Sequence, residues 1–176
     1  MKRLVGILGI SLLLFPAASV LCQSETGEST IADEEYGIYR LVADNLAGRF
    51  SVNKETMGGV RVDADVMISA NGIQPDADTI KDFNEKNDKK HRLSEAFVRV
   101  MTKNSGISGE GRQVVTFSRI GFDREKRHAM LVMGITLYYP EDVMNEGKYV
   151  FLEKQKDGWT IRNTTVAWNM RLGLIP

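Results

Sequence analysis

The sequence predicts an α+β domain in which N-terminal helices pack on a twisted antiparallel meander sheet. Apolar residues recur at three- and four-residue steps early in the chain, and they alternate with a period of two along most of its second half. Short charged turns separate the later strands, which indicates an antiparallel meander. Helices followed by a run of strands is the order of an α+β fold. We therefore expect two or three helices on one face of the sheet.

The first predicted helix begins at Asp33 and ends near Gly48. Tyr36, Tyr39 and Val42 recur at helical spacing, so one side of this helix is apolar. Three acidic residues occupy its first turn, where the helix dipole favours negative charge.

A second, shorter helix is predicted to begin within residues 75–78, which offer helix-start chemistry, and to run to about Lys86, with Ile80 and Phe83 on its apolar side. The segment 93–101 fits either a strand or the end of a helix.

The predicted strands show period-two alternation bounded by turn residues. One is expected at 60–68, before the turn pair Asn71-Gly72. The others are expected at 114–122, 129–137, 149–154 and 159–168. Charged turns at 123–126 and 156–158 connect them, and Gly158 supplies the positive φ that a tight turn needs.

Residues 1–22 are predicted to form a signal peptide. Lys2 and Arg3 precede an apolar run at 4–15, and small residues follow at 17–19. A bilayer-spanning helix needs about 20 apolar residues, and this run is shorter. We expect a flexible leader at 23–32.

A single α+β domain is expected at 33–176. Cys22 is the only cysteine, so the mature chain offers no internal disulfide and no thiolate site. Its stability must therefore come from one apolar core. Lipid anchoring through Cys22 is disfavoured because Leu21, rather than a small residue, precedes it.

Two side chains give specific tertiary expectations. Trp159 follows the last turn directly, and we expect it to pack against the helix that carries Tyr36 and Tyr39. Burying the charge of Arg119 between apolar neighbours is costly without a partner. We expect Arg119 to pair with Glu153 on a nearby strand; the alternative is that it faces a pocket and binds an anionic ligand.

The candidate binding residues are Tyr39, Asp63, Arg119 and His128. No catalytic residue, metal site or cofactor is predicted. His91 and His128 are the only histidines, and neither has a second His or Cys at ligand spacing. We expect both imidazoles to be solvated.

Several motifs resemble those of a family of uncharacterised exported bacterial proteins. They are a Tyr-x-x-Tyr helix at 36–39, a Phe-x-x-Lys-Asn helix end at 83–87 and a Ser-Arg-x-Gly-Phe hairpin at 118–122. The family's hairpin leads to a Gly-x-Trp strand, which we match to Gly158-Trp159 here. The resemblance covers most of residues 34–168 and implies no known activity. The stretch 58–71 departs from it as an apparent extra strand. The helix-plus-curved-sheet pattern is also similar, at the level of fold alone, to cystatin-like and nuclear-transport-factor-two-like cones.

These patterns favour an exported protein, periplasmic or extracellular, with a non-catalytic binding or interaction role. The expected partner is a small apolar ligand or an envelope protein. Basic and acidic residues number 23 each, without a basic patch, so nucleic acid is not expected to bind. No membrane span is expected after signal cleavage.

The alternative function is a small pocket enzyme, similar to ketosteroid isomerase, in which Tyr, Asp and His side chains transfer protons. It requires Tyr39, Asp63, Arg119 and His128 to converge in a cavity that excludes water.

The first prediction concerns export. The basic, apolar and small-residue regions occur in the order that a signal peptidase recognises, so the mature chain should begin between Val20 and Ser24. N-terminal sequencing of the protein recovered outside the cytoplasm measures this. Recovery of chains that start at Met1 from that fraction would contradict it.

Overall fold

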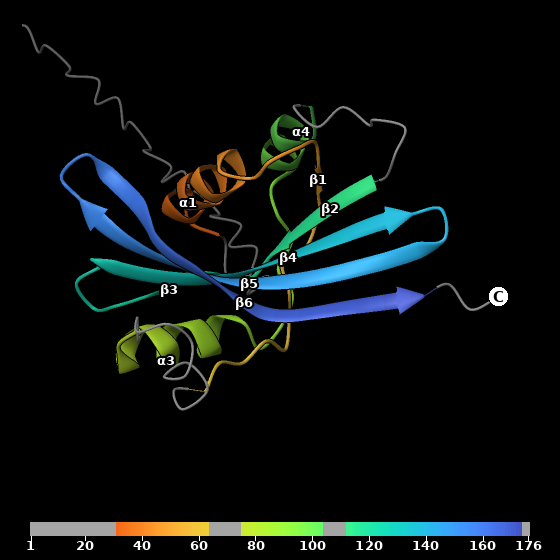
Figure 1. The fold of residues 1–176 in the computed structure, drawn as a ribbon. Helices are drawn as coiled ribbons and strands as arrows, with labels where there is room; N and C mark the ends of the chain where they lie inside the picture. Colours follow the sequence, from red (N-terminus) through yellow and green to blue (C-terminus); the bar gives the residue numbers. More distant parts are fainter. Residues whose placement is uncertain (1–30, 64–74, 104–111, 174–176) are drawn as a thin grey trace, which may run out of the picture.

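The computed structural model describes residues 31–63, 75–103 and 112–173. Within them, helices lie on both sides of one mixed sheet (Figure 1). In chain order the elements are α1 (Asp33–Asp44), β1 (Ser51–Val52), α3 (Ala77–Lys86), α4 (Glu95–Lys103), β2 (Arg112–Phe117), β3 (Gly121–Phe122), β4 (His128–Tyr139), β5 (Asp142–Gln155) and β6 (Gly158–Gly173). The α+β class is confirmed.

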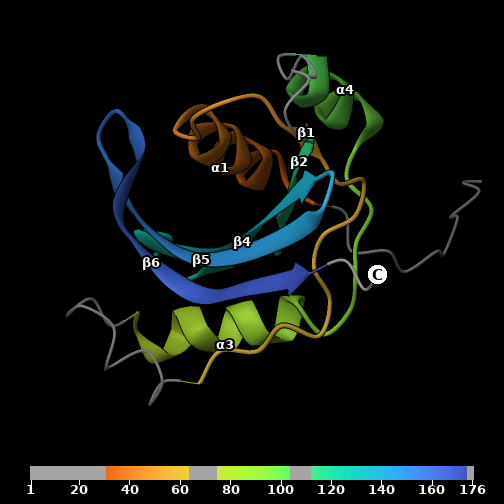
Figure 2. The same cartoon turned by 45° about the vertical axis from the view of Figure 1, so that its right-hand side comes forward.

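The strands are ordered β1-β2-β4-β5-β6. The short strand β3 stands outside this order and pairs with β4 alone. All pairs are antiparallel except β1 with β2, which is parallel. The predicted antiparallel meander is therefore present from β2 to β6, and β1 makes the sheet mixed. Register shifts at Gly147/Lys148 and Phe151/Leu152 interrupt the β5–β6 ladder, and the sheet is strongly curved (Figure 2).

The helices do not share one face of the sheet, contrary to the sequence prediction. Figure 2 shows α1 in the concavity of the sheet and α3 against its convex side. On β4, Leu131 and Met133 belong to the apolar cluster that includes α1 and α4, whereas Met130 and Val132 belong to the cluster that includes α3. Residues 129–135 are all buried, because β4 is covered on both faces. A continuous apolar run, rather than clean alternation, is the pattern of such a strand.

Most predicted helices and turns are confirmed. Asp76 accepts a hydrogen bond from the Thr79 backbone N–H at 2.7 Å and caps α3. The segment that fitted either a strand or a helix end forms α4. Gly158 has φ +126°, as its turn requires. Among the described residues, no helix is long and apolar enough to cross a membrane.

The strand predicted at 60–68 is absent over 60–63, and its remainder lies outside the described residues. Val62 is nevertheless fixed, because its backbone N–H and C=O both bond the Asn84 side-chain amide, at 2.8 and 2.9 Å. An amide of α3 thus takes the place of a neighbouring strand.

The strand predicted at 114–122 is interrupted at 118–120. The Ser118 carbonyl does not continue the ladder to β4; it accepts the Tyr39 hydroxyl at 2.8 Å. The Val132 N–H, left without that carbonyl, donates to the Ser118 Oγ at 2.8 Å. A side chain of α1 therefore ends β2.

Trp159 packs against α1, as predicted. It is partly buried at the edge of the main apolar cluster, and its indole N–H donates to the Glu34 carboxylate at 3.2 Å. Its ring also lies 5.7 Å, centroid to centroid, from that of Phe122.

The second prediction uses two glycines. A Cβ at Gly121 would lie 2.6 Å from the Thr79 carbonyl oxygen and 2.7 Å from the Phe83 nitrogen, both backbone atoms of α3. Gly121→Ala should therefore lower the free energy of unfolding by about 3 kcal/mol, measured by urea denaturation. A Cβ at Gly37 on α1 would have no heavy atom within 4 Å, so Gly37→Ala should raise it by about 0.5–1 kcal/mol. Equal effects of the two substitutions would show that α3 does not lie this close to β3.

Candidate functional site

A buried ion pair joins α1 to the segment between β2 and β3. The Arg119 guanidinium donates from Nε to Glu35 Oε2 at 2.9 Å and from Nη2 to Glu35 Oε1 at 2.7 Å. Both side chains are 3% exposed. The Ile120 N–H donates to the same carboxylate at 3.2 Å. Two parallel N–H···O bonds make a bidentate pair, the strongest form of this contact.

The predicted partner of Arg119, Glu153, is wrong. Glu153 lies on β5 and pairs with Arg162 on β6, with Nε and Oε2 3.0 Å apart. Arg119 is not on a strand, because β2 ends at Phe117 and the chain bonds to α1 before β3 begins. Strand register therefore could not identify its partner.

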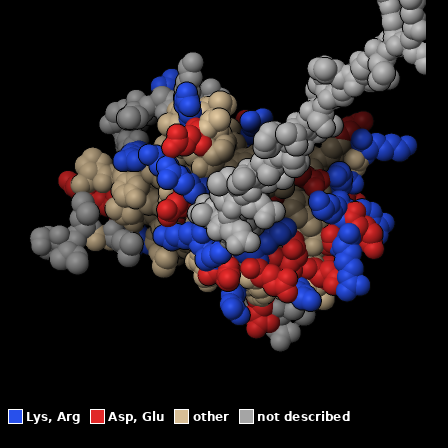
Figure 3. All heavy atoms as spheres, turned by 180° about the vertical axis from the view of Figure 1, so that it is seen from behind, with Lys and Arg blue, Asp and Glu red and all other residues tan. Residues whose placement is uncertain are grey.

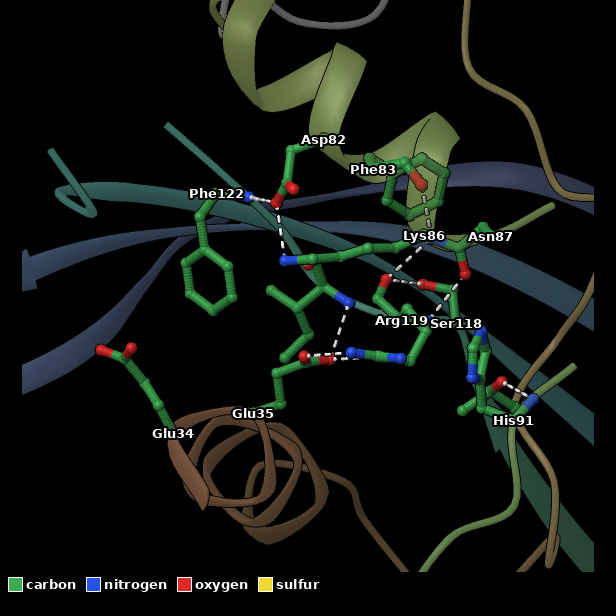
Figure 4. A network of polar contacts seen from close by, with 12 residues as sticks. Glu34, Glu35, Asp82, Phe83, Lys86, Asn87, His91, Ser118, Arg119 and Phe122 are labelled. Atoms are coloured by element: carbon green, nitrogen blue, oxygen red, sulfur yellow. Dashed lines mark hydrogen bonds and ion pairs between the residues drawn. The ribbon is translucent and has the colours of Figure 1, made fainter. Parts of the chain in front are cut away.

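The same segment is bound from the opposite side by α3 (Figure 4). The Asn87 side-chain oxygen accepts the Arg119 backbone N–H at 2.7 Å, and its Nδ2 donates to the Arg119 C=O at 3.1 Å. Lys86 Nζ donates to the Ile120 C=O at 3.1 Å. Residues 118–120, here called the inter-strand segment, are thus held between two helices.

Tyr39 lies inside this network and is fully buried. Burial foremost, and then the negative charge of Glu35, raise the pKa of Tyr39 well above its usual value. The phenol therefore stays protonated and donates to the Ser118 carbonyl. Burial by itself would lower the pKa of Arg119, but Glu35 raises it. Both groups keep fixed protonation states, which suits a scaffold better than proton transfer.

His128 lies on the convex side of the sheet, with α3. Its Nδ1 is 2.9 Å from Asp123 Oδ2 and 4.0 Å from Asp76 Oδ2. Burial alone would raise the pKa of Asp123, but the backbone N–H groups of His128 and Arg127 and the imidazole together lower it. A cavity of about 320 Å³ opens beside His128, Asp76 and Glu153.

Among the described residues, Asp76, Asp123 and His128 are the group whose ligand atoms could hold a metal ion, since these atoms lie within 4.8 Å of one another. Each is already satisfied by protein contacts: Asp76 caps α3 through Thr79, and Asp123 accepts the Arg127 N–H and faces His128. These contacts explain the cluster without an ion.

The four predicted binding residues do not meet at one place. Tyr39 and Arg119 are joined through Glu35 inside the concave face. His128 lies on the convex side, and Asp63 is exposed on the irregular chain after β1. The acid–base constellation required by the alternative function is therefore not assembled from these side chains.

The expectation that His91 is solvated is also wrong. His91 is 8% exposed, because its backbone pairs with Thr56: the Thr56 N–H donates to the His91 C=O at 2.8 Å, and the His91 N–H donates to Thr56 Oγ1 at 2.9 Å. The charged residues around His91 indicated a solvated loop. In the structure this loop pairs with a distant one at Thr56, and His91 is covered.

A groove with a volume of about 710 Å³ opens at the β1 edge of the sheet. One wall is α4 and the other comprises β1, the start of β2 and Tyr138 near the end of β4. We call this cavity the edge groove. Its apolar lining includes Val98, Val114 and Tyr138, and its basic lining consists of Lys54, Arg92, Arg99 and Arg112.

Sequence reasoning missed every residue of the edge groove. A signal was present on α4, where Glu95, Val98, Arg99 and Thr102 recur at helical spacing and line the groove. Phe97 and Met101, on the other side, enter the core. Because the sequence fitted either a strand or a helix end at 93–101, the groove-facing side of this helix could not be recognised.

No protein-family model, no curated protein and no solved structure matches this chain. Its function is therefore inferred from the geometry of its own residues.

The third prediction concerns the buried ion pair. Glu35→Gln leaves the Arg119 guanidinium buried without its counter-charge, so it should lower the free energy of unfolding by about 3–5 kcal/mol in guanidinium chloride denaturation. Glu34→Gln is the matched control. Glu34 is partly exposed and pairs with Lys154 and Lys126 at the surface, so its loss should cost about 1 kcal/mol. Similar costs for both variants would refute a special role for Glu35.

Proposed function

We propose that this is an exported, non-catalytic binding protein whose edge groove holds a small ligand with an apolar part. The observation that carries the proposal is the groove itself, whose volume of about 710 Å³ lies within the roughly 300–1,000 Å³ typical of small-molecule sites. Export rests on the sequence pattern of residues 1–22, which lie outside the described residues.

The construction of α4 supports binding at this groove. Phe97 and Met101 anchor the helix in the main apolar cluster, and Val98 and Arg99 on its other side line the groove. Backbone bonds also fix the opposite wall: the Asn53 N–H donates to the Val115 C=O at 2.8 Å. A pre-formed site of this kind loses little entropy when a ligand binds.

The placement of the candidate acid–base groups supports binding rather than catalysis. Tyr39 and Arg119 are buried in the interior, and His128 lines a different cavity, so none of these three residues lines the edge groove.

The fourth prediction tests the groove with two valines of α4. Val98→Trp places an indole in the groove and should weaken the affinity for the neutral apolar dye Nile red by about tenfold, equivalent to about 1.4 kcal/mol. Dye fluorescence titration measures the affinity, and circular dichroism checks that the helix is retained.

Val100→Trp is the matched control. Val100 is 51% exposed on the same helix and does not line the groove, so this variant should bind the dye as the parent does. Equal binding by the parent and both variants, or no dye binding by the parent, would overturn the proposal.

A further inference from the structure

The edge groove carries an excess of positive charge. Four basic residues line it, Lys54, Arg92, Arg99 and Arg112, against one carboxylate, Glu95. That carboxylate is already paired, since Arg92 Nη2 lies 3.1 Å from Glu95 Oε1. The formal charge of the lining is therefore four minus one, or +3.

Three of these cations lack a carboxylate partner among the described residues. Lys54 follows β1, Arg99 lies on α4 and Arg112 begins β2, so they come from both walls of the groove. All three are exposed to solvent. A cleft lined by charge of one sign raises the local concentration of the opposite ion.

This imbalance is local, because the whole chain has 23 basic and 23 acidic residues. Elsewhere, many surface cations pair with carboxylates: Lys86 lies 2.7 Å from Asp82, and Arg124 lies 3.0 Å from Asp78. Seen from behind, the upper left of the molecule shows more basic than acidic side chains, whereas both signs mix densely at the lower right (Figure 3).

We propose that the ligand of the edge groove is an anionic amphiphile, a single acyl chain with a carboxylate or phosphate head group. The head group contacts the guanidinium groups of Arg99 and Arg112 and the ammonium group of Lys54, and the chain lies along Val98, Val114 and Tyr138. Arginine suits this role because its planar fork of donors matches both kinds of anion. This inference rests on the proposed function of the groove and specifies its ligand.

The head group is tested by comparing four dodecyl probes, the ionic ones below their micelle concentrations and dodecanol below its solubility limit. Dodecanoate and dodecyl phosphate should bind at least about tenfold more tightly than dodecanol in isothermal titration calorimetry, and dodecyltrimethylammonium should bind most weakly. The relative affinity of the two anions identifies the preferred head group. Added sodium chloride should weaken anion binding and leave dodecanol binding nearly unchanged, because salt screens exposed charges.

Charge-removing variants locate the interaction. Arg99→Gln and Arg112→Gln should each weaken dodecanoate binding by about fivefold or more and should leave dodecanol binding unchanged. Arg40→Gln is the matched control, because Arg40 is an exposed arginine on α1 that does not line the groove. If Arg99→Gln alters the far-ultraviolet circular dichroism, Lys54→Gln replaces it, since Lys54 lies outside the helices.

The outcomes separate the two proposals. If dodecanol binds as tightly as dodecanoate, the proposal of an anionic ligand is wrong, and the proposal of a binding groove stands. The same conclusion follows if Arg40→Gln weakens dodecanoate binding as much as Arg99→Gln and Arg112→Gln do. If none of the four probes binds while Nile red binds in the groove, the proposal of an amphiphilic ligand is also wrong. Failure of the probes and of Nile red would overturn both proposals.

Discussion

The Glu35–Arg119 ion pair is the interaction on which the arrangement of the layers depends. It is the point where α1, on the concave side, contacts the inter-strand segment, while Lys86 at the end of α3 and Asn87 directly after it bind the same segment from the convex side. A buried guanidinium tolerates few geometries, because any movement that separates it from its carboxylate leaves a desolvated charge. The position of α1 relative to α3 is therefore set by polar contacts through the sheet, and apolar packing fills the space around them.

Coverage of both sheet faces determines where an open surface remains. The strand β4 is buried on its two sides over residues 129–135, so the centre of the sheet offers no room for a ligand. Tyr39 and Phe117 stack 4.9 Å apart, centroid to centroid, and fill the concave side beneath α1. The sheet becomes accessible at its β1 edge, where β1 has only two residues and α4 packs beside it. The edge groove is the consequence of that short strand.

Charged side chains have different surroundings in the interior and at this edge. Inside, the Arg119 charge is neutralised by Glu35 with both side chains 3% exposed, and the neighbouring phenol is kept neutral by burial. At the edge, three cations remain solvated and unpaired with carboxylates within the described residues. A solvated cation costs little to maintain and is free to meet an incoming anion, whereas a buried pair is already satisfied. The interior network therefore stabilises the fold, and we place binding at the edge.

The sequence by itself determined the local elements. The spacing of Tyr36 and Tyr39 predicted α1, the helix-start residues at 75–78 predicted the beginning of α3, and alternation predicted the long hairpins, because each depends on neighbours within a few residues. It also singled out Arg119 as a buried charge in need of a partner. Only the tertiary structure decided that this partner is Glu35, 84 residues away, that α3 covers the second face, and that Arg99 and Arg112 line one groove. Those outcomes depend on which surfaces meet after the chain has folded, and the spacing of residues along the chain does not encode them.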